Sequence, residues 1–288
     1  MKISSASVTS REYMNSWYQP TDRIAIFLRN YSTGESFQRI VTAERATSDR
    51  FQAWIQFLNR TSGNLYSSVN ALHPTASGRT KADIHRILGV HMEVDHGGTL
   101  AVERLLHDHR VPRPTFLINS SVGRYQLLWK VDHLTAAKAE SINKALAREF
   151  GGDPAATDVT RVLRIPSLYN LKYEPSFPIT GQYLSQESHS PSDFHLDLDT
   201  VPAMPTLGVH KPIHARARKE TTQSERDWAN VMDRLTRGES REAIQRDLEL
   251  RRQDKPQPAY YAQHTLDKAT RELEMRQRFR SHDSELEL

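Results

Sequence analysis

The sequence predicts an α+β protein with a ferredoxin-like (RRM-like) core, an α/β extension before this core and a small helical bundle after it. The first reason is the order of the segments between residues 87 and 165, which reads strand, helix, strand, strand, helix, strand. The second is a pair of strands followed by an amphipathic helix in the N-terminal part. The third is a set of three short helices that follows a proline-rich stretch.

The N-terminal extension is predicted from two kinds of periodicity. Arg23–Arg29 and Phe37–Val41 read as two strands joined by a turn that contains Gly34. Ala43–Leu58 reads as one helix because its large apolar residues recur at helical spacing. Leu65–Val69 is then expected to form a third strand of this region.

The core is predicted from alternating strands and helices with start signals. Thr135 is placed to cap the second helix of this region, since threonine is a favoured N-cap residue. The six expected elements are strand 87–95, helix 99–109, strand 115–119, strand 125–131, helix 135–150 and strand 162–165.

Domain boundaries follow from changes in composition. We expect one large domain over residues 1–190, a proline-rich polar linker over 191–222, a helical bundle over 223–276 and a flexible, highly charged tail over 277–288. Within the bundle, Gly238 is expected to end the first helix and Ser240 to begin the second.

Composition limits the classes of function. The chain has 288 residues and no cysteine, which excludes disulfides, iron–sulfur clusters and cysteine-based zinc ribbons and fits a reducing cytoplasm. No apolar run approaches the ~20 residues that a membrane helix needs, so no membrane partner is expected. The net charge of +4 is compatible with a polyanionic partner.

The first candidate motif is the strand segment from Val90 to Gly98. Because side chains alternate along a strand, His91, Glu93 and Asp95 are expected on the face opposite the apolar residues. Neighbouring carboxylates repel each other, and a hard divalent cation relieves that repulsion. The alternative is the solvated face of an edge strand, and the Gly97–Gly98 turn that follows favours the metal site.

The second candidate motif runs from Asn119 to Gln126 and combines a strand, a turn and a second strand. Ser121, Arg124 and Gln126 offer a hydroxyl, a cation and an amide around the turn at Gly123, which suits a triphosphate. An ordinary hairpin with turn-forming residues is the alternative.

The third candidate motif lies between Asp153 and Lys172. It contains Asp158, Arg161, Arg164, Asn170 and Lys172. The alternative is a surface turn in which Arg161 pairs with Asp158, although surface ion pairs contribute little stability.

The three motifs are expected to meet on one sheet. In a ferredoxin-like sheet the first strand lies between the third and the fourth, which would bring Glu93 and Asp95 close to Asp158. Three carboxylates could hold two divalent metals and so activate a 3′ hydroxyl and stabilise leaving pyrophosphate. The neighbouring cations would then counter the charge of a triphosphate or a template.

These motifs resemble those of the archaeo-eukaryotic primase superfamily, and most of all plasmid RepB-type primases and related primases of phages and mobile elements. The resemblance rests on Glu93-Val94-Asp95, on Ser121 to Trp129 and on Asp158 to Lys172. It implies that residues 1–190 form a primase catalytic domain that synthesises short primers for a plasmid or another mobile element. It also implies that Glu93, Asp95 and Asp158 are catalytic ligands of Mg²⁺ or Mn²⁺.

The resemblance further implies partners. Single-stranded DNA would be the template, nucleoside triphosphates the substrates, and a replicative helicase a further candidate partner. Ser121, Arg124, Gln126, Arg161, Arg164, Asn170 and Lys172 would bind the nucleotide, and the C-terminal bundle would help to engage the template.

Two departures and two rival functions accompany this interpretation. Many relatives have aspartate at the position of Glu93 and histidine at the position of Gln126. A nicking endonuclease that initiates replication is one rival, but His107-Asp108-His109 reads as a helix end rather than as a metal-binding strand. The other rival is a non-catalytic module that binds single-stranded DNA on the same fold.

Overall fold

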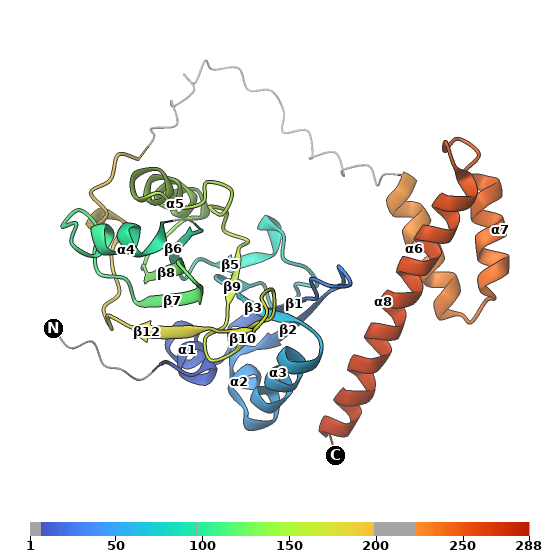
Figure 1. Ribbon diagram of the computed structural model, residues 1–288, viewed down its shortest axis with the longest axis horizontal. Helices are drawn as coiled ribbons and strands as arrows, with labels where there is room; N and C mark the ends of the chain where they lie inside the picture. Colours follow the sequence, from blue (N-terminus) through green and yellow to red (C-terminus); the bar gives the residue numbers. More distant parts are fainter. Residues whose placement is uncertain (1–6, 96, 199–222, 288) are drawn as a thin grey trace. The chain divides into compact units, whose positions relative to one another are not determined.

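A computed structural model describes residues 7–95, 97–198 and 223–287. The chain divides into two compact units, residues 1–203 and 204–288 (Figure 1). The first unit contains two antiparallel sheets with helices, and the second contains three helices. The predicted α+β class and the C-terminal helical bundle are therefore confirmed. The predicted domain boundaries stay predictions, and most of the expected linker lies outside the described residues.

The first sheet, which we call sheet A, has six strands. Its strand order is β5-β4-β1-β3-β9, and β2 pairs with β1 at full length, as the strand pair in the sequence predicted. The strands are β1 (Arg23–Arg29), β2 (Ser36–Thr42), β3 (Asn64–Ser68), β4 (Ala71–Leu72), β5 (Ile84–Arg86) and β9 (Val162–Arg164).

Helices α1 (Ser10–Trp17), α2 (Ala43–Thr47) and α3 (Asp49–Thr61) accompany sheet A. The expected single helix over residues 43–58 is wrong, because it is broken at Ser48. The backbone of Ser48 is extended (φ −63°, ψ 150°), and its hydroxyl accepts the Phe51 N–H, so Ser48 ends α2 and caps α3.

The second sheet, sheet B, has four strands in the order β12-β7-β8-β6. They are β6 (Gly89–Val94), β7 (Phe116–Ser121), β8 (Arg124–Lys130) and β12 (Thr180–Tyr183). Side chains of β6, β7 and β8 pack against α4 (Gly98–Leu106) and α5 (Ala136–Phe150) and form a hydrophobic core. Val90, Met92 and Val94 are at most 1% exposed within it, as the alternation predicted. Thr135 caps α5 by accepting the Lys138 N–H.

The predicted strand order of the core is wrong in one respect. The order of elements along the chain is the expected one, but β6 lies at the edge of sheet B and pairs only with β8. The last strand of the motif, β9, instead joins sheet A beside β3, with Tyr66 opposite Arg164. The strand itself was predicted, but so short a segment carries no signal for the strand with which it pairs.

Helix α1 joins the two sheets. The Trp17 indole donates a hydrogen bond to the Val69 carbonyl after β3, and the Tyr13 ring packs against Phe116 of β7 at 5.2 Å between ring centroids. Helix α1 therefore holds the end of β3 in sheet A close to β7 in sheet B.

Smaller elements complete the first unit. Helix α4 ends at Leu106 with His107 as its C-cap, which confirms that the His-Asp-His segment is a helix end. The remaining elements are the 3-10 helices η1 (Lys81–Asp83) and η2 (Pro191–Asp193) and the strand pair β10 (Tyr169–Asn170) with β11 (Phe177–Pro178).

The second unit contains α6 (Gln223–Thr236), α7 (Arg241–Arg251) and α8 (Pro258–Glu287). Ser240 caps α7 as predicted, and α8 extends beyond the residues expected for the third helix. Inside the bundle, Arg252 and Asp227 form a buried ion pair, and Asp227 also accepts a hydrogen bond from the Tyr261 hydroxyl. No helix in the described ranges is both long and apolar enough to cross a membrane.

Candidate active site

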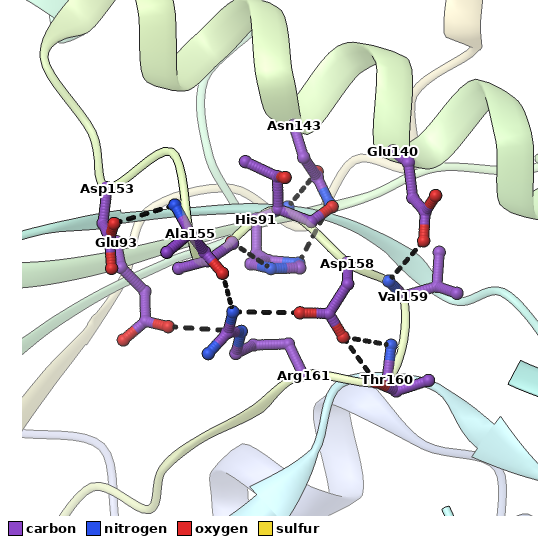
Figure 2. A network of polar contacts seen from close by, with 12 residues as sticks. His91, Glu93, Glu140, Asn143, Asp153, Ala155, Asp158, Val159, Thr160 and Arg161 are labelled. Atoms are coloured by element: carbon purple, nitrogen blue, oxygen red, sulfur yellow. Dashed lines mark hydrogen bonds and ion pairs between the residues drawn. The ribbon is translucent and has the colours of Figure 1, made fainter. Parts of the chain in front are cut away.

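The three candidate motifs meet where sheet A and sheet B adjoin. Glu93 of β6 lies opposite Gln126 of β8 in the strand register. The loop that leads from α5 to β9 carries Asp158 and Arg161 to the same place (Figure 2). The three motifs were predicted to converge on one sheet, but they converge where two sheets adjoin.

Glu93 is tied to both sheets through Gln126. The Gln126 amide donates to Glu93 Oε2 at 2.9 Å and accepts the Arg164 backbone N–H at 3.1 Å, so both ends of this buried amide are used. Burial raises the pKa of the Glu93 carboxyl above its ordinary value, although Gln126 and Arg161 oppose this increase. The negative charges of Asp95 and Asp153 also raise it, which places both carboxylates near Glu93.

Arg161 lies between two of the candidate metal ligands. Its Nη2 is 2.9 Å from Asp158 Oδ2, and its Nε is 3.7 Å from Glu93 Oε1 (Figure 2). Burial opposes ionisation of Asp158, but hydrogen bonds from Thr160 and the charge of Arg161 outweigh burial and hold the pKa of Asp158 below its ordinary value. The pairing of Arg161 with Asp158 was the structural alternative for this motif, and the pair does form. It lies beside Glu93, and we call Glu93, Asp158 and the nearby Asp95 the carboxylate cluster.

Asp95 lies at the edge of a cleft. Its side chain is 49% exposed, and its Oδ1 is 3.9 Å from Arg124 Nη1. The cleft has a volume of about 630 Å³ and is lined by Asp95, Gly97, Val122, Gly123, Arg124, Tyr173, Pro175, Ser176, Phe177 and Pro178. A carboxylate and an arginine thus face a space whose other wall is the apolar, aromatic β10–β11 hairpin.

The first two motifs are in close contact at a glycine. A methyl group on Gly98 would lie 2.3 Å from the Gly123 carbonyl oxygen and 2.7 Å from the Tyr125 ring. The start of α4 can therefore approach the β7–β8 turn only because residue 98 has no side chain. This close approach sets the distance between Asp95 and Arg124.

The other residues that were predicted to bind the nucleotide do not line this cleft. Ser121 is buried at the end of β7. Asn170 is buried, donates to the Ser120 carbonyl and accepts the Lys172 N–H, so its side chain holds the hairpin in place. Arg164 is buried over the Tyr66 ring, and Lys172 lies over the exposed Tyr31 ring.

The sequence did not reveal the residues that support the Asp158 loop. His91 is 1% exposed, and its Nε2 lies 3.0 Å from the Ala156 carbonyl oxygen. Asn143 of α5 donates to the Thr157 carbonyl, and Glu140 accepts the Val159 N–H (Figure 2). Arg79, from the loop before η1, donates to the Thr160 carbonyl. The alternation that placed His91 beside Glu93 was the only signal for any of these roles.

The buried histidine predicts a dependence of stability on pH. Burial lowers the pKa of His91 from 6.5 to about 4. Between those values the unfolded chain binds more protons, so stability falls as pH falls from 6.5 toward 4, and at pH 5 the cost is about 2 kcal/mol. Denaturant titrations with EDTA should give a smaller difference between pH 7 and pH 5 for His91→Gln than for the wild type.

His85 provides the control for this measurement because it is exposed. The His85→Gln variant should keep the wild-type difference between pH 7 and pH 5. An equal difference in wild type and His91→Gln would contradict the role of His91 as a buried neutral side chain.

The candidate ligands suit a hard divalent cation, although the described residues do not contain a preformed metal site. Among the described residues, no three histidine or acidic side chains form a cluster that could hold a metal ion. Glu93 nevertheless offers a poorly solvated carboxylate with a single close donor, and the buried Nε of Arg161 has no hydrogen-bond acceptor. Carboxylate oxygens of Glu93, Asp95 and Asp158 are the ligand type that Mg²⁺ and Mn²⁺ prefer.

The sequence profile of the RepB DNA-primase N-terminal domain matches residues 32–187, which is more than half of the chain and includes all three motifs. The chain belongs to the RepB DNA-primase family. The resemblance of its motifs to RepB-type primases is therefore confirmed. No curated protein matches this RepB-family chain.

The chain is also similar to solved structures. The catalytic domain of primase RepB′ in complex with initiator DNA is 17% identical and covers 63% of this chain and 88% of its own, with a TM-score of 0.48. Primase RepB′ is 15% identical over 90% of this chain and 94% of its own, also at 0.48. The AEP domain of the cyanophage S-2L primase-polymerase is 13% identical over 63% and 92%, and its TM-score of 0.51 indicates a shared fold.

Proposed function

We propose that this RepB-family protein is a DNA primase that synthesises short primers on single-stranded DNA for a plasmid or another mobile element. The observation that carries the proposal is that Arg161 lies between Glu93 and Asp158 at the junction of the two sheets. Asp95 is near enough to Glu93 to raise its pKa, and it contacts Arg124. Acidic side chains at a DNA-binding surface would repel phosphates unless cations accompanied them, so the cluster favours catalysis over simple binding.

The proposed reaction joins two nucleotides on a template. The 3′ hydroxyl of one nucleotide attacks the α-phosphorus of the next, and a new phosphorus–oxygen bond forms. The bond to pyrophosphate breaks, pyrophosphate leaves, and the hydroxyl proton passes to water. Glu93, Asp95 and Asp158 would hold Mg²⁺ or Mn²⁺, which when bound lowers the barrier to hydroxyl attack and stabilises the charge on pyrophosphate.

The cleft beside Asp95 is the proposed nucleotide site. Arg124 lies at its edge and would bind the triphosphate, and Tyr173 and Phe177 offer aromatic surface to the base or sugar. Gly123 faces open space, so the turn can approach phosphates closely. Ser121 lies at the end of β7, directly before this turn.

Arg161 and Gln126 take different parts in this proposal. Arg161 balances Glu93 and Asp158 until cation and nucleotide arrive, and then pairs with the triphosphate. Gln126 uses both ends of its amide within the protein, so it positions Glu93 against β9. This positioning accounts for an amide where many relatives have histidine. The helical unit is proposed to engage the template.

The test is incorporation of labelled nucleotides on single-stranded oligonucleotides by the full-length protein, with Mg²⁺, with Mn²⁺ or with EDTA. Short labelled products should form with either metal and disappear with EDTA. Absence of product with both ribonucleotides and deoxyribonucleotides under all metal conditions would refute the proposed activity.

A further inference from the structure

A continuous series of side-chain contacts leads from the carboxylate cluster to the surface of sheet A. Gln126 joins Glu93 to the backbone of Arg164, and the Arg164 guanidinium lies 4.9 Å from the centre of the Tyr66 ring. The Tyr66 and Tyr31 hydroxyls are 3.0 Å apart. At the far end, Lys172 Nζ lies 5.7 Å from the centre of the Tyr31 ring.

The strand register explains why these groups form a row. Phe27 of β1 lies opposite Tyr66 of β3, and Tyr66 lies opposite Arg164 of β9. Directly opposed residues point to the same side of a sheet. Their neighbours Ile26 and Leu28 point to the other side and are at most 3% exposed, so the aromatic and basic row occupies the opposite face of sheet A.

The inner end of the row contains an unsatisfied cation. Arg164 is only 8% exposed, and its buried Nη1 atom has no hydrogen-bond partner. A buried guanidinium that lacks an acceptor is costly, and an anionic oxygen beside it would remove that cost. Glu93 is already engaged by Gln126 and Arg161, so an anionic oxygen of a ligand would be a matching acceptor for Arg164.

The outer end of the row is exposed and also lacks an anion. Tyr31 is 49% exposed, and Lys172 forms no ion pair within the described part of the chain. Along this series of contacts, Tyr31, Tyr66 and Arg164 lie between Lys172 and the carboxylates. A triphosphate held at the Asp95 cleft is therefore a poor match for Lys172, and a longer polyanion is a better one.

We propose that this row is the path of the single-stranded DNA template, with a base stacked on Tyr31 and phosphates paired with Lys172 and Arg164. Every base has a face that can stack on an aromatic ring, and cations beside the ring bind the sugar–phosphate backbone without reading sequence. The inference rests on the proposed primase function, because the row ends at the carboxylates where a template has to present its bases.

Binding of a fluorescent single-stranded oligonucleotide to the full-length protein tests this path. Fluorescence anisotropy should give about tenfold weaker binding for Tyr31→Ala and near-wild-type binding for Tyr31→Phe, since stacking depends on the ring. Lys172→Gln should weaken binding and reduce the slope of log affinity against log salt by about 0.7, the value for one phosphate contact on a single strand.

Lys144→Gln is the matched control, because Lys144 is an exposed lysine on α5. It should bind DNA like the wild type. Thermal melts of each variant should give the wild-type midpoint, which separates loss of binding from loss of folding. Wild-type affinity in both Tyr31→Ala and Lys172→Gln would overturn the proposed path.

Primer synthesis measured with the same variants separates this inference from the proposed function. Tyr31→Ala should raise the KM for template and leave the KM for nucleotide unchanged. A raised KM for nucleotide alone would assign the row to the nucleotide and overturn the path. If the wild type makes no primer and the Tyr31→Ala variant binds DNA more weakly than the wild type, the enzymatic proposal fails and the binding path stands.

Discussion

Primer synthesis by the Asp95→Asn variant is expected to fall by about 10³-fold, while its affinity for single-stranded DNA stays within about twofold of the wild type. Metal ions at such a site contribute several kcal/mol to transition-state stabilisation, and each 1.4 kcal/mol, roughly, is a factor of ten in rate. The substituted amide would keep the shape of the side chain and lose its charge. Because Asp95 is half exposed and has only a long contact with Arg124, folding should be unaffected.

Asp153→Asn is the matched control for this experiment. Asp153 raises the pKa of Glu93 through its charge, but its carboxylate accepts the Ala155 N–H within its own loop, which asparagine can also do. We expect this variant to retain synthesis within about tenfold of the wild type. Loss of synthesis in Asp153→Asn together with retention in Asp158→Asn would replace Asp158 by Asp153 in the proposed ligand set.

Replacement of Arg161 by glutamine is expected to change two measurements in opposite directions. Synthesis should fall by about 10²-fold, because a cation that stabilises the triphosphate is lost. The rise in melting temperature caused by Mn²⁺ without nucleotide should increase, since no guanidinium would then compete for Glu93 and Asp158. Thermal-shift titrations beside the incorporation assay provide both measurements.

Arg148→Gln serves as the control for charge alone, because it removes an arginine from α5 outside the carboxylate cluster. Its synthesis and its response to Mn²⁺ should match the wild type. A fall in the Mn²⁺ response of Arg161→Gln would show that Arg161 organises the carboxylates for the cation instead of occupying its place.

Much of the fold was predictable because local signals agreed with the final structure. Alternation along residues 90–95 placed Glu93 and Asp95 on the side opposite the apolar residues, and the cap at Thr135 placed α5 correctly. Ser48 was the exception among the helices, because helical periodicity continues across it while its hydroxyl caps α3. Helix α1 was not predicted, although its capping box at Thr9 and Glu12 was a usable signal.

The details of the site could not be predicted because they depend on which strands pair. Nothing local to Val162–Arg164 indicates that this strand joins β3 in the other sheet. For the same reason, the amide of Gln126 was expected near phosphates, whereas it connects Glu93 with β9. The position of Lys172 over Tyr31 also follows from this pairing, because the hairpin continues directly from β9.

The late return of β9 to sheet A has a consequence for synthesis of the protein itself. Tyr66 and Arg164 are opposed in the sheet but lie roughly a hundred residues apart in the chain. While the ribosome is still making the middle of the protein, the edge of β3 is unpaired and open to wrong partners. That edge can close only after residues 162–164 have been made, and Arg161, which directly precedes them, can reach Glu93 only at the same stage. The order of synthesis therefore makes the charged centre and the complete first sheet available together.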